Sequence, residues 1–461
     1  MSPGEKQYER WLVALGLDDI RRMFRDHGAE SLLCKVLPQN ANSKNQVYVG
    51  SDISELGRIP SGEIRPYNSQ SGKRGGGHGP IFRTSVPLLW ITPQNTLAPA
   101  PDAKLIVYPQ YPEVRFSGFL KGCREAPSFL FDKSKRGTTP DRLLFFGPRS
   151  DRTVLALAVP PESRAAKEFL ADRSFDNYGV FAVIPLRADQ RGIGKVLLLQ
   201  ELCRIHKLGW IASKRLMRGV LVPCNATNCG GYTLEAELGI STNGTAEPDF
   251  HGWEVKARHV ASFEKAGQST VTLFTPEPDG GVYVSEGPSV FIRRWGYADT
   301  KGRIDRLNFG GVYRCGGDFH ARTGTMLVLD GYDPQTGSFQ ADGAIRLTDR
   351  AGVEAASWTF AKLMEHWKWK HAQAAFVPYM GRSEPLNYHY GSNVLLGQGA
   401  EFRFFLRAVS AGLVYYDPGI KLEGVSTATP KTKRRSQFRV ISRDLESLYR
   451  RMDLVPVCQC E

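Results

Sequence analysis

Two carboxylates and one lysine lie close together near the middle of the 461-residue sequence: Asp249, then Glu254, then Lys256. Carboxylate oxygens are ligands that Mg²⁺ prefers. A bound metal of this kind lowers the pKa of a water molecule and stabilises charge on a phosphoryl oxygen. A neighbouring lysine can orient the nucleophile or help to deprotonate it. The three residues therefore indicate chemistry that suits the hydrolysis of a phosphodiester.

The sequence around these residues has the pattern of a short hairpin. Trp253 and Val255 alternate with Glu254 and Lys256, which predicts a β-strand with the carboxylate and the ammonium group on one face. Gly252 supplies a turn that can bring the preceding carboxylate beside the strand. An exposed hairpin with a surface glutamate and lysine would have the same spacing, so the spacing alone leaves both interpretations open.

A short helix is predicted directly before the hairpin. Apolar residues recur at helical intervals between positions 232 and 240, and Glu235 lies among them. The sequence STNGT then allows the chain to pass from helix to strand within a few residues. We expect the order helix, tight connection and strand.

The hairpin, with the sequence EPDFHGWEVK, resembles the PD-(D/E)xK nuclease signature. Together with YTLEAELGI before it, the region resembles more narrowly the MvaI/BcnI restriction endonucleases and their mismatch-repair relative MutH. In that group a glutamate from the preceding helix completes the acidic site, and Glu235 has this position here. The resemblance implies a Mg²⁺-dependent DNA endonuclease with Glu235, Asp249, Glu254 and Lys256 as catalytic residues. It assigns Asp249, Glu254 and Val255 to the metal, and gives Lys256 the role of positioning the attacking water.

The composition is that of a folded chain with a basic surface. Hydrophobic residues make up 41% and aromatic residues 11%, which supports cores for two or three domains at this length. The net charge is +13 and the pI about 9.3. Such a charge favours a polyanionic partner, because neutralising phosphates releases counterions. DNA or RNA is the partner that fits both the charge and the candidate site.

We expect a cytoplasmic protein without membrane association. No apolar run has the length of a membrane span, and the first residues lack a signal-peptide core. In a reducing compartment the eight cysteines are expected to be free thiols rather than disulfides. The close pairs are Cys224 with Cys229 and Cys458 with Cys460, and neither has the spacing of a zinc site.

Residues 1–186 are predicted to form a mostly-β domain. After a helix over 4–27, short strands separated by Gly, Pro and Asn are expected at 32–37, 46–50, 86–91, 104–109, 114–119, 142–147 and 153–159. The segment 65–80 is basic and rich in glycine. It is predicted to be either a mobile loop or a loop that contacts DNA.

Parts of this region resemble the N-terminal effector domain of EcoRII, a DNA-binding pseudobarrel without a catalytic site. The resemblance is carried by CKVLPQNANSKNQVYVG, IPSG and YNSQSGKR. It implies that the domain binds a second copy of the target as an effector. The candidate DNA contacts are Lys44, Asn45, Lys73 and Arg74.

Residues 187–461 are predicted to form an α/β nuclease core, with a central mixed sheet and flanking helices. Helices are expected at 195–209, 352–375 and 399–412, and further strands at 268–275 and 326–331. The segment 417–443 is strongly basic with interleaved apolar residues, a pattern that fits a docked strand as well as a solvated tail. Arg434, Arg435 and Arg439 are candidates for phosphate or guanine contacts. His389 lies in a Tyr- and His-rich segment that can line a DNA groove.

The sequence therefore predicts a multidomain protein, with a layout that resembles restriction enzymes carrying both domains. The implied function is that of a type II, IIE-like restriction endonuclease, which binds double-stranded DNA at a catalytic and an effector site. The implied target is of the CCWGG or CCSGG kind, cut by a monomer that cleaves the strands in turn. A MutH-like nickase, a methylation-dependent nuclease and a non-catalytic DNA-binding regulator are the alternatives.

Overall fold

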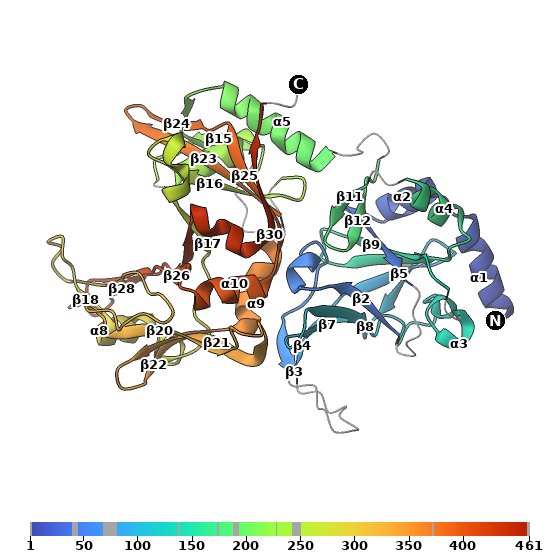
Figure 1. The fold of residues 1–461 in the computed structure, drawn as a ribbon, viewed down its shortest axis with the longest axis horizontal. Coiled ribbons are helices and arrows are strands. Elements are labelled where there is room, and N and C mark those ends of the chain that lie inside the picture. The colour runs from blue at the N-terminus through green and yellow to red at the C-terminus, as the bar shows by residue number, and fades with distance from the viewer. Residues whose placement is uncertain are drawn as a thin grey trace. The chain divides into compact units, whose positions relative to one another are not determined.

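The chain folds into two compact units, Met1–Val196 and Leu197–Glu461, coloured along the chain in Figure 1. The computed structural model describes residues 2–38, 45–67, 81–136, 139–172, 175–187, 193–226, 228–241, 250–370 and 373–458. The division between the units falls within helix α5 (Ile193–Lys207), later than the boundary predicted near residue 186. The assignment of the units to two domain families stays a prediction.

The first unit has short helices: α1 (Pro3–Ala14), α2 (Leu17–Asp26), α3 (Lys133–Arg136) and α4 (Arg164–Ala171), with 3-10 turns at Ile53–Leu56 and Ser128–Leu130. The prediction of one helix over 4–27 is wrong. Gly16 has an extended backbone and is the N-cap of α2, and its N–H donates to Asp19 at 3.0 Å. The chain therefore breaks at Leu15–Gly16 and starts a second helix.

Most of the regular secondary structure described in the first unit is strand, as predicted. One sheet contains, in spatial order, β11 (Asp176–Tyr178), β12 (Phe181–Ile184), β1 (Leu32–Leu37), β9 (Arg142–Pro148), β10 (Val154–Val159), β5 (Leu88–Ile91) and β6 (Leu97–Ala100). The other contains β2 (Gln46–Gly50), β8 (Glu113–Ser117), β7 (Lys104–Tyr108), β4 (Ile81–Ser85) and β3 (Arg65–Tyr67). The seven strands predicted from short apolar runs are confirmed at nearly the predicted positions.

An aromatic cluster fills the core between these sheets. Trp90 is fully buried, and its Nε1 donates to the carbonyl of Phe119 at 2.7 Å. The ring of Phe116 stacks on Phe119 and meets Phe146 edge-on. Such packing fixes the two sheets face to face, because large rings bury much area in defined orientations.

The second unit is built around a mixed sheet, as predicted. Its spatial order is β13 (Ile211–Ala212), β24 (Leu386–Tyr390), β23 (Gln373–Ser383), β25 (Asn393–Ala400) and β30 (Tyr449–Pro456), and β16 (Glu254–His259) also pairs with β23. The pairing of β16 with β23 is parallel, whereas the other pairs described for this sheet are antiparallel. Helices α5 and α6 (Cys229–Glu237) share a core with this sheet that includes Leu198, Leu234, Val255 and Tyr379.

Smaller sheets complete the second unit. They contain β14 (Lys214–Met217) with β15 (Val220–Pro223); β17 (Thr270–Phe274), β29 (Phe438–Ile441) and β26 (Val414–Tyr416); β20 (Thr325–Tyr332), β21 (Phe339–Asp349) and β22 (Glu354–Thr359); and β18 (Tyr297–Ala298), β19 (Arg306–Gly310), β27 (Gly419–Glu423) and β28 (Lys431–Lys433). The remaining helices are α7 (Val282–Ser285), α8 (Pro288–Trp295), α9 (Phe360–Lys370) and α10 (Phe402–Ser410), with 3-10 turns η4 (Phe263–Gln268) and η5 (Ser442–Leu448). In the described part of the chain, no helix combines the length and the apolar character needed to cross a membrane.

The predicted helix over 352–375 is wrong in its first part and at its end, where Gln373 begins strand β23. Residues Glu354–Thr359 form strand β22, in which Trp358 pairs with Ile345 of β21. Helix α9 starts at Phe360, next to Thr359, whose backbone N–H donates to Asp279. The apolar residues fit either period, so packing against β21 decided the outcome. The predicted helices at 195–209 and 399–412 are confirmed as α5 and α10, and the strands at 268–275 and 326–331 as β17 and β20.

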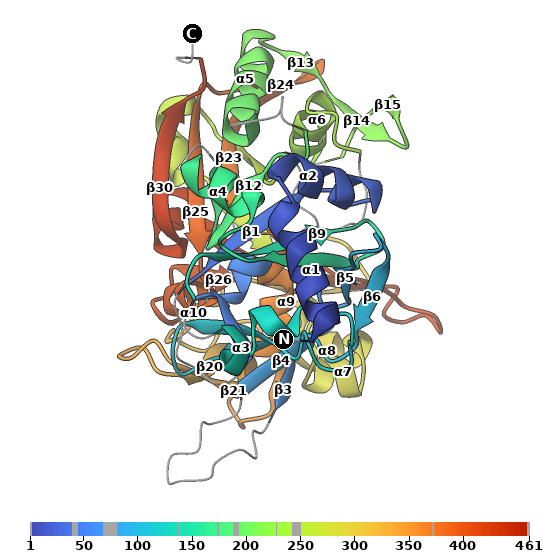
Figure 2. The ribbon, with the colours of Figure 1, turned by 90° about the vertical axis from the view of Figure 1, so that its right-hand side faces the viewer.

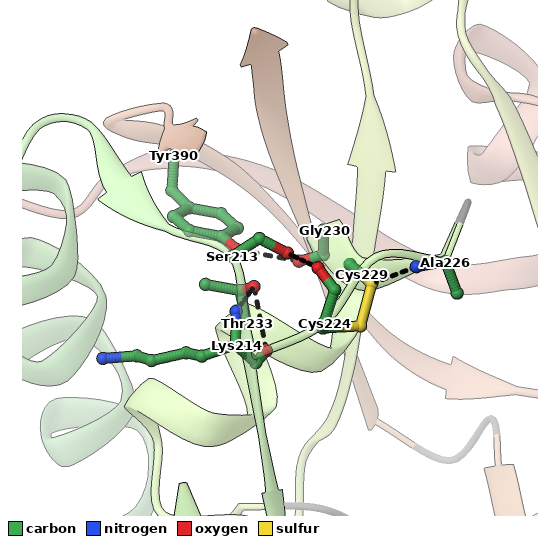
Figure 3. Close-up of a disulfide and its surroundings, with 8 residues drawn as sticks. All are labelled: Ser213, Lys214, Cys224, Ala226, Cys229, Gly230, Thr233 and Tyr390. Atoms are coloured by element: carbon green, nitrogen blue, oxygen red, sulfur yellow. Dashed lines mark hydrogen bonds between the residues drawn. A yellow bond between two sulfur atoms is a disulfide. The ribbon is translucent and has the colours of Figure 1, made fainter. Parts of the chain in front are cut away.

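The expectation of free thiols is wrong for four cysteines. A disulfide joins Cys203 of α5 to Cys458, just after β30, with a Cα–Cα distance of 5.0 Å. A second joins Cys224 to Cys229, at 5.8 Å, and closes the connection between β15 and α6 (Figure 3). Both Cα distances lie in the range that a disulfide bridges. Each bond ties a helix of the second unit to a strand end.

Candidate active site

Glu254 and Lys256 lie on one face of β16 and contact each other. Nζ of Lys256 is 3.0 Å from Oε1 of Glu254, and the two side chains are only 14% and 9% exposed. A carboxylate buried to this extent needs a compensating charge or hydrogen bond. The pair therefore excludes the alternative of an exposed hairpin whose glutamate and lysine face solvent.

The opposite face of β16 anchors the strand in the core. Trp253 and Val255 are buried in the cluster that also holds Leu234 of α6. The side chain of Val255 is aliphatic, so only its main-chain carbonyl can serve as a ligand. The strand thus presents polar groups on one side and is fixed by apolar groups on the other.

Glu235 is half-buried on α6, and α6 packs against β16. The neighbouring residue Leu234 is buried in the shared core, which sets the rotation of the helix. The hydroxyl of Tyr390 donates to the carbonyl of Gly230 at 2.7 Å, so the first turn of α6 is tied to strand β24 (Figure 3). A Cβ at Gly230 would collide with the ring of Tyr379 and lie 2.6 Å from its hydroxyl. The helix that carries Glu235 is therefore held at close range.

Asp249, the remaining predicted carboxylate, lies outside the described residues. Within the described ranges, no three His, Cys, Asp or Glu side chains gather in a way that could hold a metal ion. The carboxylate of Glu254 and the carbonyl of Val255 are hard oxygen donors on one strand, and this donor chemistry fits Mg²⁺ better than it fits zinc.

Arg258 is a buried cation on the face of β16 that carries Glu254 and Lys256, and it was missed by the sequence reasoning. It is 4% exposed, and its Nη1 donates to the carbonyl of Ala266 and to the hydroxyls of Ser269, at 3.2 Å, and Ser442, at 3.4 Å. Burial lowers the pKa of the Arg258 guanidinium to about 10. Its Nε has no hydrogen-bond partner among the described residues. Arg258 thus ties the end of β16 to η4, to β17 and to η5.

Tyr449, at the start of β30, was also missed. Burial and the negative charge of Glu254 raise the pKa of its phenol, so the ring lies within electrostatic range of that carboxylate. Its ring contacts Phe376, which pairs with Lys256 in the parallel ladder, and covers Gly397, where a Cβ would be 2.8 Å from the ring. A glycine inside an apolar strand is the signal that could have indicated this close approach.

The segment that contains these elements matches a known family. The model of the MvaI/BcnI restriction endonuclease family matches residues 199–449, which is more than half of the chain. The chain belongs to the MvaI/BcnI restriction endonuclease family. Two similar solved structures are the complex of restriction endonuclease MvaI with its cognate DNA substrate and MvaI in the absence of DNA, each at 18% identity. The match to the DNA complex covers 56% of this chain and 96% of the MvaI chain, with a TM-score of 0.43. The match to MvaI without DNA covers 57% of this chain and 99% of the MvaI chain, with a TM-score of 0.32. No curated protein matches the chain.

As a member of the MvaI/BcnI family the chain is a site-specific DNA endonuclease, so its basic residues are candidate DNA contacts. Arg434 and Arg435 are exposed between β28 and β29. Arg439, on β29, is 28% exposed and forms an ion pair with Asp417. Arg434 and Arg435 are therefore available to phosphates. Arg439 already has a carboxylate partner, which DNA would have to share or displace.

The other predicted contacts differ in their surroundings. His389, half-buried on β24, stacks on His206 with ring centroids 5.4 Å apart and contacts Trp210 and Phe263. Burial and the neighbouring His206 lower the pKa of the His389 imidazole. Asn45 is exposed directly before β2. Lys44, Lys73 and Arg74 lie outside the described residues.

Proposed function

We propose that this chain is a type II restriction endonuclease of the IIE kind, which hydrolyses DNA at a short specific site in a Mg²⁺-dependent reaction. The observation that carries the proposal is the buried contact between Glu254 and Lys256 on β16, inside the segment that the MvaI/BcnI family model matches. A lysine fixed beside a carboxylate on a packed strand is an arrangement that suits metal-assisted phosphodiester hydrolysis.

The roles follow from the donor chemistry of the residues. Asp249, Glu254 and the carbonyl of Val255 would hold Mg²⁺, with Glu235 from α6 completing the acidic set. A divalent cation there supplies positive charge at the scissile phosphate. Lys256, whose ammonium group is held by Glu254, orients the attacking water and stabilises the charge that develops in the transition state.

The first unit is proposed to bind a second DNA site as an effector. Across its five-stranded sheet the register aligns Tyr48, Arg115, Ile106, Arg83 and Arg65 in one row. Arginines and exposed tyrosines on one sheet face suit contact with phosphates and bases. Arg65 is paired with Glu63, and Arg115 with Glu113. DNA phosphates would have to displace these carboxylates or share the arginines with them.

The proposed DNA contacts of this unit adjoin strands of the same sheet in the sequence. Asn45 directly precedes β2, and Lys44 is its neighbour in the sequence. Lys73 and Arg74 belong to the segment that joins β3 to β4. Because these residues adjoin strands of this sheet in the sequence, we propose that one DNA duplex engages them together with the row of arginines.

The finer properties proposed are a CCWGG- or CCSGG-like target, a monomer that cuts the strands in turn, and a cytoplasmic location where DNA is the substrate. The target preference rests on the family alone. The monomeric state likewise rests on the family alone.

Digestion of unmethylated phage DNA by the purified full-length protein tests the proposal. Discrete fragments in Mg²⁺, and none in EDTA or with Glu254→Gln, are expected, and sequencing of their ends gives the site. Fragments that persist in EDTA would contradict the metal dependence. Single-strand nicks would favour a MutH-like nickase, cutting of methylated DNA alone a methylation-dependent nuclease, and tight binding without cutting a regulator.

The effector role has a separate test. A plasmid with one target should be cut slowly, and faster when a short duplex with the same target is added in excess. Asn45→Ala should abolish the acceleration and leave the basal rate unchanged. An acceleration that survives in the variant would contradict the proposed contacts.

A further inference from the structure

The hairpin β14–β15 lies directly before the helix that carries Glu235. Its strands pair Lys214 with Pro223 and Met217 with Val220. The turn residues Arg218 and Gly219 both have positive φ, 48° and 81°, so the hairpin closes with a two-residue turn of the I′ kind. Figure 2 shows β14 and β15 extending outward from α6.

Apolar side chains cover both faces of this hairpin without being buried. Met217 is 41%, Val220 62% and Leu221 54% exposed. Because side chains alternate along a strand, Met217 and Val220 share one face and Leu221 lies on the other. A two-stranded hairpin gains little stability from its own contacts, so exposed apolar groups on both faces indicate a surface that is used for binding.

The charges of the hairpin indicate an anionic partner. Between positions 213 and 226 the sequence contains Lys214, Arg215 and Arg218 and no acidic residue. Arg218 is exposed at the tip, in a backbone region where asparagine or glycine is more usual. A tip that combines exposed apolar and cationic side chains fits a polyanion with an apolar interior, which is a DNA duplex.

The base of the hairpin is fixed to α6, as Figure 3 shows. Oγ1 of Thr233 accepts from the backbone N–H of Lys214 at 3.1 Å and donates to its carbonyl at 3.0 Å. The ammonium group of Lys214 lies 2.5 Å from Glu237. The disulfide between Cys224 and Cys229 joins the end of β15 to the first residue of α6. The hairpin and the catalytic helix therefore move as one body.

We propose that the tip of β14–β15 enters the minor groove of the substrate DNA beside the scissile phosphate. Met217 and Val220 act there as a wedge against the base pairs, and Arg215 and Arg218 contact the flanking phosphates. Apolar wedges of this kind unstack a base step and bend the duplex. Bending at a fixed distance from Glu235 would bring the phosphate to the acidic site. The inference rests on the proposed function, because it places the substrate of that same site.

The decisive measurement uses duplexes that carry the target with 2-aminopurine at each step near the cut site, in Ca²⁺ to prevent cleavage. The wild-type protein is expected to raise the fluorescence at one step, since unstacking relieves quenching. Met217→Ser with Val220→Ser should abolish that rise and slow single-turnover cleavage in Mg²⁺ by 10-fold or more. Val284→Ser, which alters an exposed apolar residue of α7 (51%), is the matched control and should behave as wild type.

Arg218→Asn gives a second test that does not depend on the folding of the serine variants. Asparagine is comfortable at positive φ, so the turn is kept. Loss of one phosphate contact should lower the slope of log K against log salt by about 0.9.

Serine variants that cleave and unstack as wild type does, or an unchanged salt slope for Arg218→Asn, would overturn the inference. So would variants that change only the oligomeric state, since the hairpin would then be a protein-binding surface. If the wild-type protein itself fails to cut DNA in Mg²⁺, the proposed function fails instead.

Discussion

Nζ of Lys256 lies 3.0 Å from Oε1 of Glu254, two residues earlier on the same face of β16. Both side chains are mostly buried, so each one needs the other to offset the cost of its burial. The proposed catalytic pair is therefore also a structural pair, and the two roles can be separated by substitution.

Lys256→Met and Glu254→Gln should each lower the single-turnover cleavage rate by 10²-fold or more, while binding in Ca²⁺ stays within a few-fold. Each single variant leaves a buried charge without its partner and should destabilise the second unit by roughly 3 kcal/mol. The double variant should be more stable than either single variant and no more active, because residues that act as a unit are not additive. Urea unfolding and cleavage assays measure both. A double variant destabilised by the sum of the single effects would contradict the coupling.

Gly230 and Gly231 are adjacent on α6 and differ in the space around them. Gly230→Ala would place a Cβ into the ring of Tyr379, so it should displace the helix, cost about 1–3 kcal/mol and slow cleavage by moving Glu235. Gly231 has nothing within 4 Å of such a Cβ among the described residues. Gly231→Ala should therefore stabilise α6 by up to about 1 kcal/mol and leave cleavage unchanged. Equal effects of the two substitutions would contradict the close contact with Tyr379.

The two disulfides should stabilise the second unit unequally. Cys203–Cys458 spans 255 residues and Cys224–Cys229 spans 5. In the chain-entropy description, closing the 255-residue loop contributes about 5–6 kcal/mol and closing the 5-residue loop about 2 kcal/mol. Cys203→Ser should thus lower the melting temperature of this unit more than Cys224→Ser does. Dithiothreitol should lower the melting temperature of the wild type and have less effect on a variant that combines Cys203→Ser with Cys224→Ser. Identical melting with and without reductant would contradict both bonds.

The stability of the second unit should depend on pH through His389. Burial and His206 lower the pKa of the His389 imidazole in the folded state, so the unfolded chain binds a proton more readily. The free energy of unfolding is therefore highest above the ordinary histidine pKa of about 6.5, where His389 is neutral in the folded and the unfolded chain. It falls as the pH drops below that value. His389→Gln should reduce the slope of unfolding free energy against pH between about 5 and 7. His27→Gln, in the first unit, should leave that slope of the second-unit transition unchanged. A steeper slope in His389→Gln would contradict the sign.

The sequence predicted those features that local pattern controls. Short apolar runs between turn residues located β1, β2 and β9, and the alternation around Glu254 predicted both a strand and a shared face with Lys256. The sequence pattern did not separate β22 from α9, because the apolar residues near Trp358 fit the period of a strand as well as that of a helix. The pairing with β21 decided between the two. The pattern of apolar residues also did not show the break at Leu15, the C-cap of α1, and Gly16, the N-cap of α2.

The rest of the site depends on contacts that are distant in the sequence. Tyr449 approaches Glu254 only because β30 joins the far edge of the central sheet through β25. Arg258 reads in the sequence as one more basic residue of a basic chain. Its burial against Ser269 and Ser442 is a consequence of β17 and β29 pairing beside it. The pairing of Cys203 with Cys458 has the same origin, since neither residue has a local partner.

The parallel pairing of β16 with β23 also has a consequence for how the protein is made. Glu254 finds its ladder partner in Ala374, and the strands on the far side of β23 follow later still. A ribosome that has translated residues 1–372 has therefore released all four candidate catalytic residues but not the strand that holds them. Since proteins emerge from the N-terminus, a nascent or prematurely terminated chain carries the acidic residues without an assembled nuclease. We therefore expect cutting activity to begin only after β23, β25 and β30 have been translated.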